Sequence, residues 1–222
     1  MADYVTAEQN YVYQIPPHLT YQTAALIEPF AVAAHAARRA SIQMGEKVLI
    51  VGAGAIGLMV CALCKLSGAQ EIIVVDFAPA RLALAKTLGA TVTINPRDGA
   101  NLAETVLQLT AGNGVDKSFE CVGRESTLIQ AIESIRKNGT CTVIGIFEEP
   151  LSTFPIARLV THEIHIQGAQ GYCWDFPIAM AASKQIDLSA FVSHVFKLDD
   201  LQEAIETNLN PQSNSIKVIV EP

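Results

Sequence analysis

Charged residues are scarce in this sequence, and those present are more often acidic than basic. Asp, Glu, Lys and Arg make up 17% of its 222 residues, whereas globular proteins average about 25%. The apolar content of 50% excludes a disordered chain, because such a chain buries enough surface to offset the entropy lost on folding. The net charge of −7 leaves no excess of cations to neutralise a phosphate backbone, so we expect no nucleic-acid partner.

Cysteines and targeting signals are also few. The five cysteines are an odd number in a long chain, and the first ten residues include Asp3 and Glu8 but no apolar signal core. We therefore expect reduced thiols and a cytoplasmic protein. Residues 48–64 carry no charge and approach the length of a membrane helix. Because three glycines interrupt that segment, we expect no membrane span.

The sequence contains no convincing set of metal ligands or catalytic side chains. Cys61 and Cys64 lie in an apolar helical segment with no second ligand pair at zinc spacing, so we interpret them as core residues. His162 and His165 are three residues apart around a strand start, and this odd spacing directs their side chains to opposite faces. We also identify no nucleophile with a recognisable base.

From Lys47 onward, β-branched runs alternate with helical periodicity, which is typical of a parallel sheet with crossover helices. The expected strands are 47–51, 71–76, 91–94, 115–120, 139–145 and 163–167. The expected helices between them are 55–66, 79–88, 102–110 and 127–136. The sequence therefore predicts an α/β fold with a doubly wound, six-stranded parallel Rossmann sheet.

Both flanks depart from this alternation. In the N-terminal flank, residues 11–15 alternate like a strand, and residues 23–40 form an Ala-rich helix containing Pro29. The C-terminal flank is predicted to hold helices 176–183 and 199–207 and one strand, 216–220. The end strands have no obvious place in the six-stranded sheet and resemble parts of a second domain. We divide the chain into a domain remnant and linker (1–29), a dinucleotide-binding domain (30–170) and a C-terminal segment (171–222).

A glycine-rich turn follows the first strand of the alternation. Gly52, Gly54 and Gly57 have the spacing of a dinucleotide fingerprint, at the junction of an apolar strand and an apolar helix. Gly52 permits a tight turn, Gly54 admits a pyrophosphate, and Gly57 lets the helix close on the strand. Free amides at the helix start, including those of Ala55 and Ile56, would favour the anion. We interpret this segment as a nucleotide site, although a purely structural turn is the alternative.

Asp76 ends the second strand at about the distance from the glycines at which an acid contacts the adenosine ribose. Its carboxylate can accept hydrogen bonds from ribose hydroxyls but would repel a 2′-phosphate. We therefore expect NAD rather than NADP. Arg81, five residues later, could pair with a phosphate and keeps NADP open; the alternative is that it lies on a solvated helix face.

Several segments resemble one family closely. They are 25–29, 52–57, 76 with 81–82, 88–90, 120–123, 163–168, 194 with 196, 198–204 and 217–218. In these segments the sequence is similar to the C-terminal, cofactor-binding part of zinc-dependent medium-chain alcohol and polyol dehydrogenases. Within that family it resembles the sorbitol, butanediol and threonine dehydrogenase branch.

The resemblance implies further cofactor contacts. Along the nicotinamide half it implies Cys121, Val122, Ile144, Gly145, Ile146, Gly168, Ala169 and Gln170. It also implies that Lys217 lies near the pyrophosphate and that Glu28 is at or beside a catalytic zinc, for which a carboxylate is a suitable ligand. The alternative for the residues implied along the nicotinamide half is that they are ordinary strand-to-loop backbone. The alternative for Glu28 is that it is a solvated helix residue.

The same resemblance implies a zinc held by Cys, His and acid ligands in a GroES-like catalytic domain that we expect to be missing from this chain. Zinc polarises the alcohol oxygen so that hydride can leave the adjacent carbon. We therefore expect an NAD-binding part that is inactive alone, with zinc only in a complete family member and a secondary alcohol or polyol as substrate. Tyr172 would supply one wall of the substrate pocket, and the sheet edge near 163–167 would form a homo-oligomer.

Three other functions remain open on the sequence alone. A standalone dinucleotide-binding or regulatory module would show the same fingerprint without dehydrogenase chemistry. A methyltransferase has a similar glycine turn and a similar acid after its second strand. A zinc-free quinone reductase relative is also conceivable, although Glu28 would then have no role.

Overall fold

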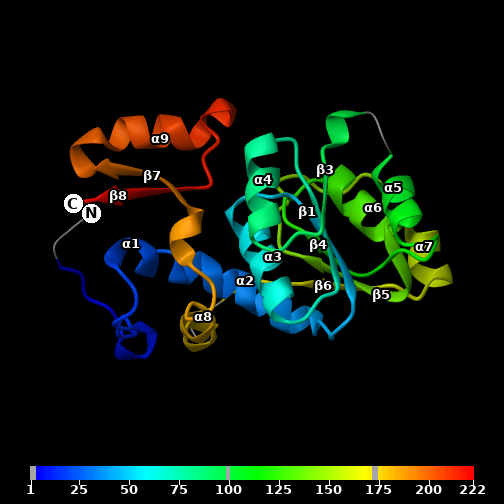
Figure 1. Cartoon of the computed structure of the whole chain (residues 1–222), viewed down its shortest axis with the longest axis horizontal. Helices are drawn as coiled ribbons and strands as arrows, with labels where there is room; N and C mark the ends of the chain where they lie inside the picture. The colour runs from blue at the N-terminus through cyan, green and yellow to red at the C-terminus, as the bar shows by residue number, and fades with distance from the viewer. Residues whose placement is uncertain (1–3, 99–100, 172–174) are drawn as a thin grey trace.

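A computed structural model describes residues 4–98, 101–171 and 175–222 and has a parallel sheet at its centre (Figure 1). The strands are β1 (Lys47–Val51), β2 (Glu71–Val75), β3 (Val92–Ile94), β4 (Val115–Glu120), β5 (Ile135–Val143) and β6 (His165–Gly168). Neighbouring strands are parallel, in the order β3-β2-β1-β4-β5-β6. The order reverses direction between β1 and β4, which is where doubly wound sheets open a ligand crevice. The predicted six-stranded fold is confirmed.

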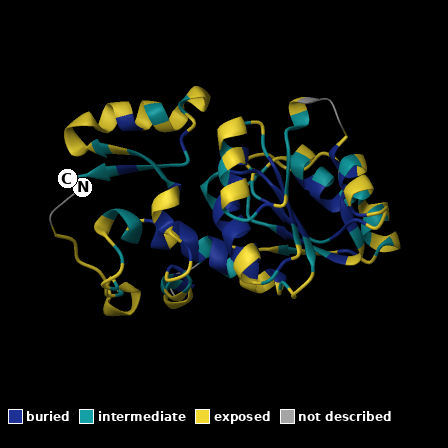
Figure 2. Cartoon of the chain, viewed as in Figure 1, coloured by how far each residue is buried: buried dark blue, intermediate teal, exposed yellow. Residues whose placement is uncertain are grey.

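Helices cover both faces of this sheet because successive strand residues point to opposite sides. Val48 and Ile50 of β1 face the first layer, while Leu49 and Val51 face the second. The first layer holds α2 (Ile27–Ala40), α3 (Ala55–Leu66) and α4 (Pro79–Thr87), and the second holds α5 (Leu102–Leu109), α6 (Glu125–Glu133) and α7 (Ile156–Thr161). In Figure 2 the buried residues, in dark blue, gather in the central sheet and in the helices that pack on it. Cys61 and Cys64 are fully buried in the first layer, which confirms that they are core residues.

A smaller lobe lies beside the sheet (Figure 1). It contains a second parallel pair, β7 (Val192–Lys197) and β8 (Lys217–Glu221), connected through α9 (Leu201–Leu209). The sequence predicted β8, as residues 216–220, but missed β7, and the prediction is corrected in this respect. The strand β7 is only half-buried and its pairing is irregular between Val192 and His194, so its apolar alternation is weak. Its strand state depends on β8, which is distant in sequence.

A buried ionic cluster attaches α8 (Phe176–Ala182) to α2. The carboxylate of Asp175 is fully buried, accepts a hydrogen bond from Arg38 Nη2 at 2.6 Å and lies 3.0 Å from His35 Nδ1. A buried carboxylate is stable only when it is paired in this way. The cluster therefore holds the C-terminal segment against the first helix layer.

The predicted N-terminal strand is wrong. Gln9–Tyr11 forms a short 3-10 helix, and residues 12–15 pair with no strand among the described residues. Tyr13 of this segment instead contacts α8, since its ring lies 5.5 Å from that of Phe176. An alternating pattern predicts a strand only where a neighbouring strand is available to pair with it.

Other element boundaries also need correction. The predicted helix 23–40 is two helices, α1 (Tyr21–Ala24) and α2. Pro29 lies in the first turn of α2, where its missing N–H costs nothing, and its ring prevents the helix from continuing backward. The predicted helix 127–136 is α6, two residues earlier at its start, and its last predicted residues begin β5. The left-handed backbone at Glu163, with φ of 51°, delays β6 to His165.

Membrane-spanning helices were not expected from the sequence. Across the three described ranges, no helix is long and apolar enough to cross a membrane.

Candidate dinucleotide-binding site

The three glycines of the fingerprint have different steric surroundings at the β1–α3 junction. Gly52 has φ of +99°, and a Cβ there would lie 2.7 Å from Val122 Cγ2. A Cβ on Gly57 would overlap the carbonyl oxygen of Gly52, so glycine is needed for helix and strand to approach. At Gly54, by contrast, a Cβ would meet no described atom within 4 Å. Gly52 and Gly57 therefore serve the fold, and Gly54 borders open space.

This open space lies at the N-terminus of α3. Gly54 is the N-cap residue, and among the described residues no side chain caps the helix. The first amides of a helix, here those of Ala55, Ile56 and Gly57, have no acceptor within the helix. Together with the helix dipole they form a site for an anion. The residues therefore fit a dinucleotide diphosphate.

Asp76 follows β2 and connects two loops. Its Oδ2 accepts a hydrogen bond from Ala53 N at 2.7 Å, and its Oδ1 accepts one from Ala78 N at 2.8 Å. A carboxylate has about four acceptor positions, so capacity remains for hydroxyl donors of a ligand. The half-buried side chain thus orients the glycine turn and presents acceptors beside it.

Arg81 lies on α4 and extends toward the C-terminal segment. Its Nη2 donates to the carbonyl of Ser215 at 2.8 Å, while its buried Nε has no hydrogen-bond partner within the described ranges. This contact brings the start of β8, where Lys217 lies, next to α4. Sequence reasoning also missed Arg97, whose guanidinium lies over the Phe77 ring, 5.7 Å from its centroid. In the sequence, the signal that could have indicated Arg97 was a basic side chain shortly after the third predicted strand.

The loops after β4 and β5 bring together the residues implied for the nicotinamide half. Val122 is 43% exposed and Ile146 is 86% exposed, and both line a hollow of about 590 Å³. The other lining residues are Gly123, Arg124, Glu125, Phe147, Glu148, Glu149, Pro150 and Ser152. Ile144 and Gly145 lie in the same β5 loop and donate to the carbonyl of Glu120.

The end of β6 lies beside β5. Ala169 N donates to the carbonyl of Val143 at 2.9 Å, and Gly168 and Gln170 on either side are exposed. These residues continue the row of strand ends that begins at β1. The carboxyl ends of parallel strands share one edge of a sheet, and ligands of open α/β sheets bind outside that edge.

Burial controls the chemistry of the cysteines at this site. Burial raises the pKa of the Cys61 thiol to about 12, and it also raises the pKa of Cys121, next to the buried carboxylate of Glu120. Both groups are therefore neutral thiols at physiological pH, and neutral thiols are poor nucleophiles. Neither thiol is therefore a nucleophile at this pH.

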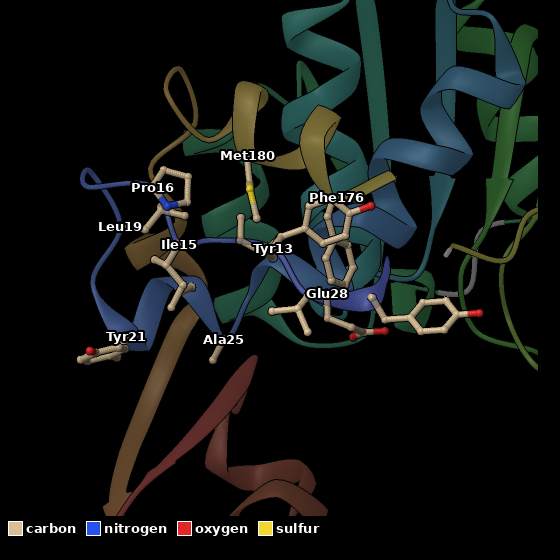
Figure 3. Close-up of a pocket in the computed structure, with 13 residues that line it drawn as sticks. Tyr13, Ile15, Pro16, Leu19, Tyr21, Ala25, Glu28, Phe176 and Met180 are labelled. Carbon is tan, nitrogen blue, oxygen red and sulfur yellow. The ribbon is translucent and has the colours of Figure 1, made fainter. Parts of the chain in front are cut away.

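Glu28 lies in the first turn of α2 and is exposed. It borders an apolar hollow of about 450 Å³, which is also lined by Phe176, Tyr13 and Met180 (Figure 3). Within the described ranges, no three His, Cys, Asp or Glu side chains come close enough to hold a metal ion. Glu28 therefore has no set of protein co-ligands among these residues. Tyr172, expected to form a pocket wall, lies outside the described residues.

Comparison with known proteins identifies a matching family and several relatives. Residues 55–185 match the family described as zinc-binding dehydrogenase. Sorbitol dehydrogenase of Bacillus subtilis is 36% identical over 221 residues, covering 99% of this chain and 62% of that protein. D-xylulose reductase of Saccharomyces cerevisiae is 31% identical over 227 residues, covering 100% of this chain and 64% of that protein.

Solved structures give the same relationship. The crystal structure of 2R,3R-butanediol dehydrogenase from Bacillus subtilis superimposes with a TM-score of 0.86 at 31% identity, covering 95% of this chain and 60% of that one. The chain thus spans less than two thirds of the length of each of these relatives.

Proposed function

This chain belongs to the zinc-binding dehydrogenase family, and on that premise we propose that it is the NAD(H)-binding part of an enzyme that transfers a hydride between a secondary alcohol or polyol and NAD. The observation that carries the proposal is that the open space at Gly54 lies close to the carboxylate of Asp76. Open space lies over uncapped helix amides at Gly54, and an acid with free acceptor capacity lies beside it.

In this proposal each part of the sheet edge binds one part of the cofactor. The amides of Ala55 and Ile56 bind the diphosphate, and Lys217 adds positive charge near it. Asp76 accepts hydrogen bonds from the adenosine ribose and repels a 2′-phosphate, so NAD is preferred. Val122 and Ile146, with the rest of the β4, β5 and β6 loops, contact the nicotinamide ring.

We further propose that zinc acts only in a complete family member, where it supplies the Lewis acid for the alcohol oxygen. Glu28 would be this chain's contribution beside that metal. The division into segments 1–29, 30–170 and 171–222 belongs to the same proposal, in which the flanks pack against a catalytic domain. The chain alone then binds cofactor and does not oxidise alcohols.

A homo-oligomer is part of the proposal. Within the described residues β6 is an edge strand of the sheet, and such edges promote pairing with another chain. Ile166 of β6 and Val160 of α7 are exposed, at 37% and 69%. We expect light scattering to report a dimer or larger species, and a monomer at high protein concentration would contradict this expectation.

Calorimetry and a turnover assay test the central proposal. NAD and ADP-ribose should both bind the chain, and polyols, diols and threonine should give no NADH, with or without added zinc. Failure of both ligands to bind would refute cofactor binding. A thermal shift with S-adenosylmethionine but not with NAD would favour a methyltransferase instead. Turnover that EDTA does not reduce would contradict the proposed dependence on zinc.

A further inference from the structure

We propose that Glu120 is a positioning residue that shapes the nicotinamide end of the crevice. This inference rests on the proposed cofactor function, because it assigns the loops after β4 and β5 to the nicotinamide half. Glu120 is fully buried at the end of β4, directly before Cys121 and Val122. Buried carboxylates are rare unless their surroundings pair them, so its partners indicate what it does.

One oxygen of Glu120 gathers three donors from the following turn. Its Oε1 accepts hydrogen bonds from Val122 N at 2.9 Å, Gly123 N at 2.9 Å and Thr127 Oγ1 at 2.7 Å. One acceptor oxygen that receives several hydrogen bonds fixes the positions of their donors relative to one another. The side chain therefore closes the turn between β4 and α6 and determines where Val122 projects.

The backbone of the same residue attaches the neighbouring loop. The carbonyl of Glu120 accepts Ile144 N at 2.9 Å and Gly145 N at 3.1 Å, in the loop after β5. Both loops that would contact the nicotinamide are thus hydrogen-bonded to this one residue. A change in its position would move both loops together.

Two glycines allow these loops to touch. Gly123 has φ of +85°, and a Cβ there would overlap the carbonyl oxygen of Ile146. A Cβ on Gly145 would lie 2.5 Å from Glu120 Oε2, a buried oxygen without a hydrogen-bond partner in the part of the chain that the structure describes. The carboxylate is therefore packed between the loops, and its volume helps to separate them.

Of these contacts, that of Val122 borders the glycine turn. The amide of Val122 donates to Glu120, and its side chain lies against Gly52 of the β1–α3 turn. A Cβ on Gly52 would come within 2.7 Å of Val122 Cγ2. The adenosine half depends on other groups, namely Asp76 and the α3 amides. Loss of Glu120 should therefore affect the nicotinamide half selectively.

Comparing two ligands tests this selectivity. ADP-ribose has the adenosine, diphosphate and second ribose of the cofactor but no nicotinamide. We expect Glu120→Ala to weaken NADH binding to the full chain by about tenfold, as when part-buried donors lose their acceptor, with ADP-ribose binding changed less than about twofold. Glu120→Gln keeps an acceptor oxygen for the same donors and should restore NADH affinity to within about threefold of wild type.

The matched control is Thr110→Val. Thr110 is also buried, and its hydroxyl also accepts a backbone amide, that of Gly114 at 2.9 Å, but it lies between α5 and β4, away from the strand ends of the crevice. This variant should lower the melting temperature and leave the ratio of NADH to ADP-ribose affinity unchanged. If Glu120→Ala does not fold, Glu120→Asp, which keeps the carboxyl group but is one methylene shorter, should show the same selective loss.

The outcomes separate this inference from the proposed function. If wild-type chain binds neither ligand, the proposed function fails. If wild type binds NADH no more tightly than ADP-ribose, or if the Glu120 variants weaken both ligands equally, cofactor binding stands and the positioning role is refuted. A selective loss of NADH binding that glutamine restores would support it.

Discussion

Neutralising Asp76 gives the most direct test of cofactor choice. Asp76→Asn keeps the size of the side chain and one acceptor oxygen, but it removes the negative charge. In the structure that charge strengthens a 2.7 Å hydrogen bond from Ala53 N and a 2.8 Å hydrogen bond from Ala78 N. The substitution therefore changes both the glycine turn and the acceptor offered to the ribose.

The magnitude follows from these bonds. A hydrogen bond to a charged group contributes about 1.5–3 kcal/mol and a neutral one about 0.5–1.5 kcal/mol, so losing the charge while keeping one acceptor should raise the Kd for NAD by roughly tenfold. A 2′-phosphate 4 Å from the carboxylate is repelled by about 1 kcal/mol in bulk water and about 4 kcal/mol near a protein surface. Because Asn removes that repulsion, the preference for NAD over NADP should fall by at least about fivefold.

Isothermal titration of both cofactors measures this change, with Asp116→Asn as the control. Asp116 also accepts a backbone amide, from Lys47 at 2.7 Å, and pairs with Arg136 Nε at 2.6 Å, but it lies at the opposite ends of the strands. Partial burial raises the pKa of Asp116, but the Lys47 amide and Arg136 outweigh it and hold the pKa below its usual value. The control should lose stability and keep its NAD affinity. Unchanged NAD affinity in Asp76→Asn would refute the assignment.

Two further predictions concern steric space and pH. In Gly54→Ala the added Cβ would meet no described atom, and φ is −70°. Its melting temperature should therefore stay within about 2 °C of wild type while its NAD affinity falls at least about tenfold. In Gly57→Ala the added Cβ would overlap backbone, so this variant should lower the melting temperature by about 4–8 °C. Hydrogen bonds from Thr153 and Ser152 lower the pKa of Glu125 to about 2 from its usual 4.5. Since the folded-state pKa is the lower one, this stabilisation is complete above about pH 4.5 and is lost as the pH falls toward about 2. The difference in unfolding free energy between wild type and Glu125→Gln should therefore shrink over that range in urea titrations, and a constant difference would contradict the argument.

The six strands and the glycine turn were predictable because they depend on local properties. Apolar runs such as 47–51 are buried on both sides in a parallel sheet, and such runs can be recognised from their composition alone. The requirement for glycine at position 57 follows from the close approach of one helix to one strand. The alternation from Lys47 onward therefore predicted the six strands, with errors only at their ends.

The sequence by itself thus determined the sheet, the turn and the acid at position 76. Only the tertiary structure decided that residues 11–15 are not a strand, that β7 pairs with β8, and that Arg81 donates to Ser215. It also decided that Glu120 joins two loops. In each of these cases the partner lies elsewhere along the chain or depends on how a turn closes, and local pattern carries no information about which distant groups a fold brings together.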